Sequence, residues 1–294
     1  MTGEQIIIDN DVILDGEDNL VVDGNQHHRV FWVTDGVTAT LRRFSITRGS
    51  AAIGGGVFNQ GGTLTISDSS LTGNLAEAAG AGIHNANGEL TLINTSIRAN
   101  QGDPGSTGGG IYNSGTLDMD GCTVSGNTAS EGGGIDNDGA LTITNSTISG
   151  NMIGSGTGGA FANDGTVTLI SSTIAGNESA SIAGDTGAVS AASTIIDGEC
   201  VGAIDSQGYN VESPDDTCSL DGAGDLANVA SGALALEPLA DNGGPTQTHA
   251  LAGASVAVDA IPGAACDVET DQRGEPRPET GGTQCDIGAF EVQP

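Results

Sequence analysis

A glycine-rich hexapeptide ending in asparagine recurs five times along the middle of the chain, and this repeat constrains the fold more than any other feature. The copies are GGGVFN (54–59), GAGIHN (80–85), GGGIYN (108–113), GGGIDN (132–137) and GGAFAN (158–163). Their terminal asparagines are separated by 26, 28, 24 and 26 residues. A repeat of this length is typical of solenoids, in which each unit packs only against its neighbours.

A short segment with alternating apolar and polar residues follows each copy, beginning with TLTI at 63–66. A period of two indicates a β-strand, so Leu64 and Ile66 are expected to face inward while Thr63 and Thr65 face outward. About three short strands and three turns fit into each unit. The sequence therefore predicts an all-β fold, a single-stranded right-handed parallel β-helix with 24–28 residues per coil.

Two asparagine columns mark equivalent turns of successive coils. Asparagine tolerates the left-handed backbone of a sharp turn, and stacked amides can bond the coil above or below. We interpret both columns as structural ladders and not as catalytic groups. The first column is Asn59, Asn85, Asn113, Asn137 and Asn163, and the second is Asn74, Asn100, Asn127, Asn151 and Asn177.

Composition and charge agree with a narrow solenoid core and restrict the partners. The chain has 49 glycines and only 3% aromatic residues, fewer large side chains than a compact globule of 294 residues needs. The formal net charge is −31 and all seven basic residues are arginines. Such a surface repels nucleic acid and anionic membranes. Adaptation to a salty habitat would explain the acidity equally well.

Four of the five cysteines fall in the last third of the chain, in loop-rich sequence. The simplest pairing is Cys200–Cys218 and Cys266–Cys285, although four cysteines permit three pairings. Metal binding is the weaker alternative, because no pair has ligand spacing. Disulfides imply an oxidising compartment. We divide the chain into N-terminal coils with a cap (1–53), regular repeats (54–199), and terminal coils with a disulfide-containing C-terminal cap (200–294).

Two resemblances cover much of the chain. The GG[GA] part of the repeats resembles the units of bacterial polymorphic outer membrane proteins, although the aromatic FxxN form is not kept. Residues 236–291 resemble the choice-of-anchor Q domain through NGGPT (242–246), THAL (248–251), DQRG (271–274), Arg277-Pro278 and DIGAFE (286–291). The resemblance implies a secreted, surface-displayed β-helix protein, whose native membrane or wall anchor is expected to be absent from this chain. It implies no particular activity.

One outward column combines aromatic, imidazole and carboxylate groups on consecutive coils, namely Phe58, His84, Tyr112 and Asp136. Aromatic faces can stack on sugar rings, and the polar groups can bond hydroxyls. We predict that this column binds a polysaccharide or a cell-surface glycan. The alternative is a variable surface column without a ligand.

Three aspartates lie near one turn of adjacent coils, namely Asp136, Asp138 and Asp164. Hard carboxylate oxygens are the ligands that calcium prefers, so these three side chains could hold a calcium ion. The alternative is a group of solvated turn residues.

Three function classes remain open. An extracellular adhesion or glycan-binding protein is preferred. A polysaccharide lyase or glycoside hydrolase is the first alternative, because paired carboxylates could serve a glycosidase, although among 38 acidic residues some pairs arise by chance. An ice-binding solenoid is the second, because threonines recur at outward positions. Both arrays are interrupted. The first is Thr63/Thr65 with Thr166/Thr168, and the second is Ser70/Thr72 with Thr123/Ser125 and Thr147/Ser149.

Charged residues of the tail admit a structural interpretation. We expect them to form an ion-pair network that ties the cap to the last coil. They are Asp259, Asp271, Arg273, Asp286 and Glu291.

Overall fold

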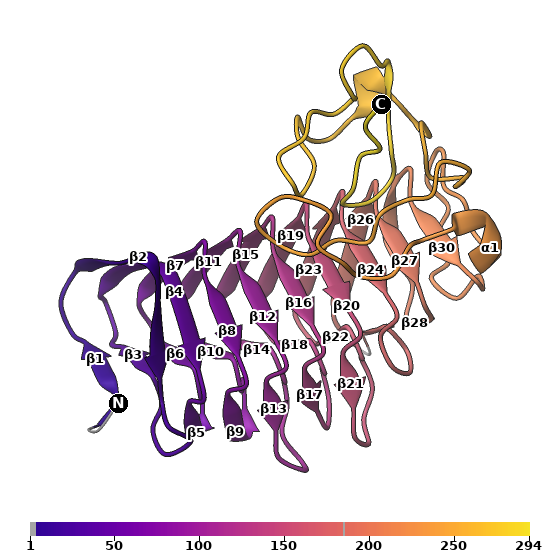
Figure 1. Cartoon of the computed structure of the whole chain (residues 1–294). Helices are drawn as coiled ribbons and strands as arrows, with labels where there is room; N and C mark the ends of the chain where they lie inside the picture. Colours follow the sequence, from indigo (N-terminus) through magenta and orange to yellow (C-terminus); the bar gives the residue numbers. More distant parts are fainter. Residues whose placement is uncertain (1–3, 185) are drawn as a thin grey trace.

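The chain forms a right-handed parallel β-solenoid of about 8 turns, followed by a compact C-terminal cap (Figure 1). The computed structural model describes residues 4–184 and 186–294. Its helices are α1 (Ser231–Leu234) and a three-residue 3-10 turn at Gly263–Ala265. The predicted fold class is confirmed, and the two predicted disulfides, Cys200–Cys218 and Cys266–Cys285, are both present.

Sheet A runs the length of the solenoid and carries the strand of each repeated hexapeptide. Its parallel strands stack in the order of the chain. They are β1 (Ile6–Ile8), β3 (Phe31–Val33), β6 (Val57–Gln60), β10 (Ile83–Ala86), β14 (Ile111–Asn113), β18 (Ile135–Asn137), β22 (Phe161–Asn163), β25 (Ile182–Ala183) and β28 (Cys200–Val201).

Sheet B consists of two strand columns that meet in β4 (Thr38–Thr47), which also pairs with β2 (Val12–Asp23). The first column is β7 (Thr63–Ser67), β11 (Glu89–Ile93), β15 (Thr116–Asp120), β19 (Ala140–Thr144), β23 (Thr166–Ile170), β26 (Ala188–Ala192) and β29 (Asp205–Gly208). The second is β8 (Ser70–Thr72), β12 (Ser96–Arg98), β16 (Thr123–Ser125), β20 (Thr147–Ser149), β24 (Thr173–Ala175), β27 (Ile195–Asp197) and β30 (Val211–Ser213).

Sheet C adds a fourth strand to the middle coils, so the expectation of three strands per coil is wrong. Its strands are β5 (Ser50–Ile53), β9 (Leu75–Ala79), β13 (Gln101–Gly102), β17 (Thr128–Ala129) and β21 (Met152–Ile153). Four of these strands begin directly after an asparagine of the second ladder, as β9 does after Asn74 and β13 does after Asn100. A separate sharp corner divides the two columns of sheet B, and a residue with positive φ recurs there, for example Asp68, Asn94 and Gly121.

The core is a set of in-register apolar columns inside the solenoid. On sheet A, Val57 pairs with Ile83, which pairs with Ile111, and all three side chains are fully buried. Leu64 and Ile66 of β7 are also fully buried, whereas Thr63 is exposed and Thr65 is partly exposed. The alternation read from the sequence therefore describes which side chains fill the core.

Both asparagine columns form continuous ladders along the coils. The amide of Asn59 donates to the side-chain oxygen of Asn85 over 2.8 Å, and Asn85 donates in the same way to Asn113 over 2.7 Å. In the second ladder, Asn100 donates both its backbone N–H and its amide to Asn127. Each buried amide is thus satisfied by the equivalent residue of the next coil.

The C-terminal cap does not simply prolong the stack. After β30 the chain forms α1 and then folds back, so that residues 236–294 lie over the second column of sheet B (Figure 1). The cap contains a short antiparallel pair of strands, β31 (Ile261–Pro262) and β32 (Gln284–Cys285). The cap has its own small apolar cluster with the last coils, which includes Leu234 and Ile287.

Single-copy residues dock the cap on the coils. The Thr147 hydroxyl donates to Gln272 over 2.6 Å, and the Gln272 amide donates to the carbonyl of Cys122 over 3.0 Å. Ser149 Oγ lies 2.8 Å from His249 Nε2. The docking therefore uses the hydroxyl array of β16, β20 and β24 as its receiving surface.

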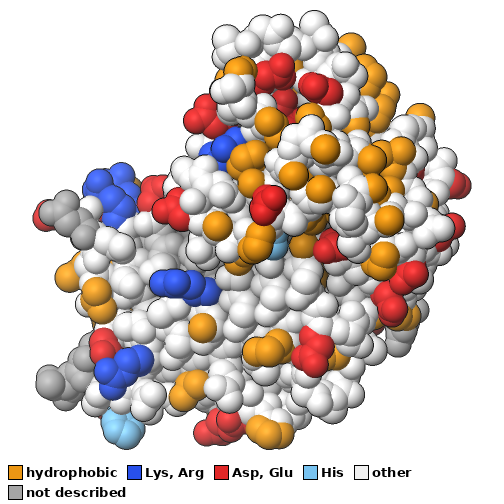
Figure 2. Space-filling model, turned by 45° about the vertical axis from the view of Figure 1, so that its right-hand side comes forward, with side chains coloured by type: hydrophobic (Ala, Val, Ile, Leu, Met, Phe, Trp, Pro, Cys, Tyr) orange, Lys and Arg blue, Asp and Glu red, His pale blue; other side chains and the backbone are white. Residues whose placement is uncertain are grey.

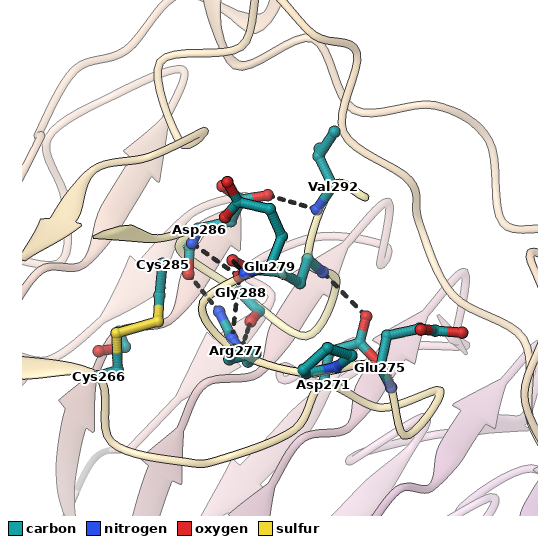
Figure 3. Close-up of polar contacts among 12 residues, drawn as sticks. Cys266, Asp271, Glu275, Arg277, Glu279, Cys285, Asp286, Gly288 and Val292 are labelled. Carbon is teal, nitrogen blue, oxygen red and sulfur yellow. Dashed lines mark hydrogen bonds and ion pairs between the residues drawn. A yellow bond between two sulfur atoms is a disulfide. The ribbon is translucent and has the colours of Figure 1, made fainter. Parts of the chain in front are cut away.

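The charged tail residues bind one another inside the cap, and this corrects the expectation that they tie it to the last coil. Arg277 forms an ion pair with Glu291 at 3.1 Å and donates to the carbonyls of Asp286 and Gly288 (Figure 3). Arg273 pairs with Asp271. The Asp286 carboxylate accepts the backbone N–H of Asp259. The network holds the cap together, whereas Gln272 and His249, together with Asp267 through the Ser193 hydroxyl, attach it to the coils.

Candidate functional site

The predicted outward column lies on sheet A, and the structure lengthens it by one residue. Trp32, Phe58, His84 and Tyr112 pair in register on β3, β6, β10 and β14. We call these four residues the aromatic strip. Sequence reasoning missed Trp32 because β3 precedes the first recognisable hexapeptide. Its strand FWV (31–33) still shows the inward, outward, inward burial of the later copies.

The rings of the aromatic strip contact one another along the solenoid axis. The ring centroids of Trp32 and Phe58 are 6.2 Å apart, those of Phe58 and His84 5.4 Å, and those of His84 and Tyr112 4.6 Å. Mutual contact leaves His84 only 9% exposed, whereas the other three side chains are half-buried. Burial lowers the pKa of His84 to about 4, so its imidazole is neutral near pH 7.

Arg29 supports the first two rings of the strip. Its guanidinium carbon lies 5.9 Å from the Trp32 ring centroid and 5.0 Å from that of Phe58. Hydrogen bonds to the carbonyls of Ile53 and Gly54 and to the Gln5 side chain fix its position. The cation over the ring faces strengthens the packing and places donors beside the strip.

The strip ends in an acidic pocket. Asp136 is the next residue of the column, and a pocket of about 160 Å³ is lined by Asp136, Asp138, Asp164 and Glu131 together with Thr157, Ala162, Asn163 and Ala183. Tyr112 joins strip and pocket, because its hydroxyl donates to Asp138 over 2.5 Å. Ala162, which pairs in register with Asp136, continues the column, and its small, largely buried side chain forms part of the pocket wall.

Asp136 is the most perturbed carboxyl of this pocket. Burial, with a smaller contribution from the charges of Asp138, Glu131 and Asp164, raises the pKa of Asp136 to about 6. Burial and the hydrogen bond to Asp138 likewise raise the pKa of Tyr112, so its hydroxyl stays protonated. The pocket thus combines a carboxyl that titrates near pH 6 with neighbours that accept hydrogen bonds.

The three aspartates considered as calcium ligands line this pocket without converging. Asp164 accepts the Thr186 hydroxyl over 2.8 Å, and Asp138 accepts the Tyr112 hydroxyl. Within residues 4–184 and 186–294, no three carboxylate, histidine or cysteine groups come close enough together to hold a metal ion. Calcium binding by Asp136, Asp138 and Asp164 therefore stays a prediction.

The two threonine arrays differ in how far they are exposed to solvent. The array on β16 and β20 is buried under the cap, since Thr123 and Thr147 are fully buried and Ser149 nearly so. The array on the first column of sheet B remains open, and there Thr65, Thr91 and Thr142 are only partly buried. Asp118 interrupts it between Thr91 and Thr142. The β16 and β20 part of the second array is thus unavailable to ice, whereas Ser70 and Thr72 on β8 remain partly exposed.

Comparison with known protein-family models, curated proteins and solved structures finds no match for this chain. The two disulfides indicate an oxidising environment. Among the helices of the described chain, none has the length and apolarity needed to cross a membrane. The geometry of sheet A is therefore the main guide to function.

Proposed function

We propose that the protein binds a neutral, extended glycan along sheet A, and that it serves as an adhesion or glycan-binding module. The observation that carries this proposal is the aromatic strip, which runs over four consecutive coils and ends in the acidic pocket. Strands of successive coils are ~4.8 Å apart, so a polymer lying along the strip meets a new ring at each coil. Many weak contacts then add up to useful affinity.

The chemistry of the surroundings selects the class of glycan. The half-exposed rings of Trp32, Phe58 and Tyr112 offer apolar edges to sugar C–H groups. Asp136, Asp138 and Glu131 accept hydrogen bonds from sugar hydroxyls. A net charge of −31 and a carboxylate-lined pocket repel uronate or sulfate groups. The ligand we expect is accordingly rich in hydroxyls and uncharged.

A location outside the cell belongs to the same proposal. It is supported by the oxidising environment that the disulfides indicate and by the resemblance of the tail to the choice-of-anchor Q domain. In this proposal a membrane or wall anchor displays the solenoid on the cell surface.

The test is a glycan array with neutral and acidic polysaccharides, followed by affinity measurements on Trp32→Ala, Tyr112→Ala and the control Thr168→Ala. Thr168 lies on β23, in sheet B. Losing one aromatic contact costs about 1–2 kcal/mol, so we expect both strip variants to bind about five- to thirtyfold more weakly. The control should bind as the wild type does. Equal affinities of all four proteins for a glycan that binds would exclude this face.

Glycoside hydrolysis is the second candidate, and the pKa of Asp136 favours it. A carboxyl with a pKa of about 6 that has other carboxyl groups beside it fits the arrangement of a general acid and its partner. Release of reducing ends from a bound glycan near pH 5–6, abolished in Asp136→Asn, would support an enzyme. A glycan that binds but is not cleaved would instead support a binding module without hydrolase activity.

A further inference from the structure

The cap covers only part of the second strand column of sheet B. It docks on β16, β20 and β24, and on β16 the Thr123 hydroxyl donates to the carbonyl of Gln247 over 2.6 Å. The equivalent residues of β8 and β12, Ser70 and Ser96, stand in register with Thr123 but are partly exposed. Figure 2 shows the cap standing above the solenoid, with a step where the two parts meet. Part of the docking surface is therefore open beside the edge of the cap.

A pocket of about 260 Å³ lies at this edge, and we call it the cap-edge pocket. One side belongs to β8 and β12, which contribute Ser96 and Arg98, and the other belongs to the cap loop that contains Asp241 and Gln247. The volume is smaller than that of typical drug-sized sites, which enclose roughly 300–1,000 Å³. The pocket therefore suits a ligand of the size of an amino acid or a short peptide.

Arg98 brings an uncompensated positive charge to this pocket. Its exposed side chain makes no hydrogen bond or ion pair within residues 4–184 and 186–294, whereas the other six arginines bond to carboxylates or to backbone carbonyls. Its neighbours in register, Thr72 on β8 and Ser125 on β16, carry no charge. A protein with 38 acidic residues thus leaves this guanidinium without a carboxylate.

Asp241 brings the opposite charge from the cap. Its Oδ1 accepts the backbone N–H of Gly243 over 3.2 Å, and in the described chain its carboxylate forms no ion pair, with Arg98 or with any other group. The Ser96 hydroxyl and the Gln247 side-chain amide also have no hydrogen-bond partner among the described residues. Opposite charges and two uncharged polar groups therefore line one space without satisfying each other.

These charges select a ligand that carries both signs. Asp241 and the net charge of −31 repel a purely anionic ligand, and Arg98 repels a purely cationic one. A guanidinium can donate two parallel hydrogen bonds to a carboxylate. An ammonium group has three donors and no acceptor, so it matches the carboxylate of Asp241.

We propose that the cap-edge pocket binds a zwitterion with one carboxylate and one ammonium group, that is, a free α-amino acid or a short peptide. Arg98 and the Ser96 hydroxyl hold the carboxylate, and Asp241 holds the ammonium group. The Gln247 amide bonds to the polar groups between them. The pocket lies on sheet B and the aromatic strip on sheet A, so this inference is independent of the proposed glycan binding.

The test is an NMR titration of the full chain with L-alanine and three related compounds. N-Acetyl-L-alanine lacks the ammonium group and L-alaninamide lacks the carboxylate, whereas L-alanyl-L-alanine keeps both charges. Since a hydrogen bond to a charged group is lost with either charge, we expect both zwitterions to bind about tenfold more tightly than the two singly charged compounds. The tighter of the two zwitterions then shows whether the pocket prefers free amino acids or peptides.

Arg98→Gln and Asp241→Asn should each weaken binding of the zwitterions about tenfold. Arg48→Gln and Asp118→Asn are the matched controls, because they remove the same charges from exposed positions outside the pocket, and they should bind as wild type does. Circular dichroism checks that all four variants are folded. The proposal is overturned if neither zwitterion binds wild type at its highest soluble concentration. It is also overturned if N-acetyl-L-alanine binds as tightly as L-alanine, or if the pocket variants bind as the controls do.

Discussion

The solenoid and its cap are built on opposite principles. In the solenoid, each structural group is repeated, so Asn127 bonds to Asn100 on one side and to Asn151 on the other. In the cap, each group occurs once, and Arg277 alone joins Glu291, Asp286 and Gly288. A repeated contact is supported by its neighbours on both sides. A single contact has no substitute, so the cap should be more sensitive to individual substitutions.

Arg277→Ala should cause the largest loss of stability. Arg277 and Glu291 are both almost completely buried, so the substitution leaves a buried carboxylate without its partner. Breaking such a pair costs about 3–5 kcal/mol. When unfolding in urea is monitored by hydrogen exchange, we expect the cap to open at a lower urea concentration than the solenoid does. Arg48→Ala removes a half-exposed ion pair with Asp23 and should cost at most about 1 kcal/mol. Similar losses in both variants would contradict the comparison.

Asn127→Ala tests the ladder inside the solenoid. It removes an acceptor for the backbone N–H and the amide of Asn100, and both donors are buried. Leaving them unsatisfied should cost about 2–3 kcal/mol in the free energy of unfolding. Asn177→Ala, at the half-exposed end of the same ladder, should cost about 1 kcal/mol because water replaces the lost partner. A larger loss at Asn177 than at Asn127 would show that stacking does not support the ladder.

Gln272→Ala tests the attachment between the two parts. The Gln272 side chain contacts Thr147, Thr123 and the carbonyl of Cys122, all across the docking surface. We expect the cap to detach more easily by about 1–2 kcal/mol, with faster exchange in β16 and β20 and little change in the remaining coils. Gln293→Ala is the control, because Gln293 is a partly exposed glutamine whose side chain donates to the carbonyl of Pro276 within the cap. Unchanged exchange in Gln272→Ala would mean that other contacts hold the cap.

Periodicity explains which parts of the fold the sequence could predict. Inward columns and asparagine ladders repeat at one spacing and are therefore visible without coordinates. The strands of sheet C were hidden, because they are short and share no residue pattern, as in LAEAA of β9, QG of β13 and TA of β17. Cap docking was hidden as well, because Gln272 and Cys122 are 150 residues apart and occur once each.

The candidate site was predicted in part for the same reason. Phe58, His84 and Tyr112 occupy one position of the hexapeptide, so their column followed from the alignment. The alignment did not predict how deeply each side chain is buried. His84 is only 9% exposed because it contacts the neighbouring rings, and no sequence pattern encodes those contacts. Trp32 and Arg29 belong to coils whose sequence departs from the repeat. Glu131 enters the pocket from the loop before β18 and had no visible signal.

Asp136→Asn should have the smallest effect on the free energy of unfolding. It tests whether burying a carboxylate at an outward position of the solenoid destabilises the fold. The pKa of Asp136 is about 6 in the fold and 3.8 for an unperturbed aspartate. The folded state therefore binds more protons between these values, and the stability that this carboxyl contributes is lost as pH rises from 3.8 to 6. The asparagine variant lacks this penalty.

We expect Asp136→Asn to match wild type at pH 3.5 and to exceed it by about 1 kcal/mol at pH 7.5, a discounted fraction of the 1.36 kcal/mol that each pKa unit represents. The difference in melting temperature at the two pH values measures this gain. Asp118→Asn removes the same charge from an exposed position of β15 and reports the general relief of repulsion in a protein of charge −31. An equal gain in both variants at pH 7.5 would assign the effect to net charge, and the pocket around Asp136 would then impose no burial cost of its own.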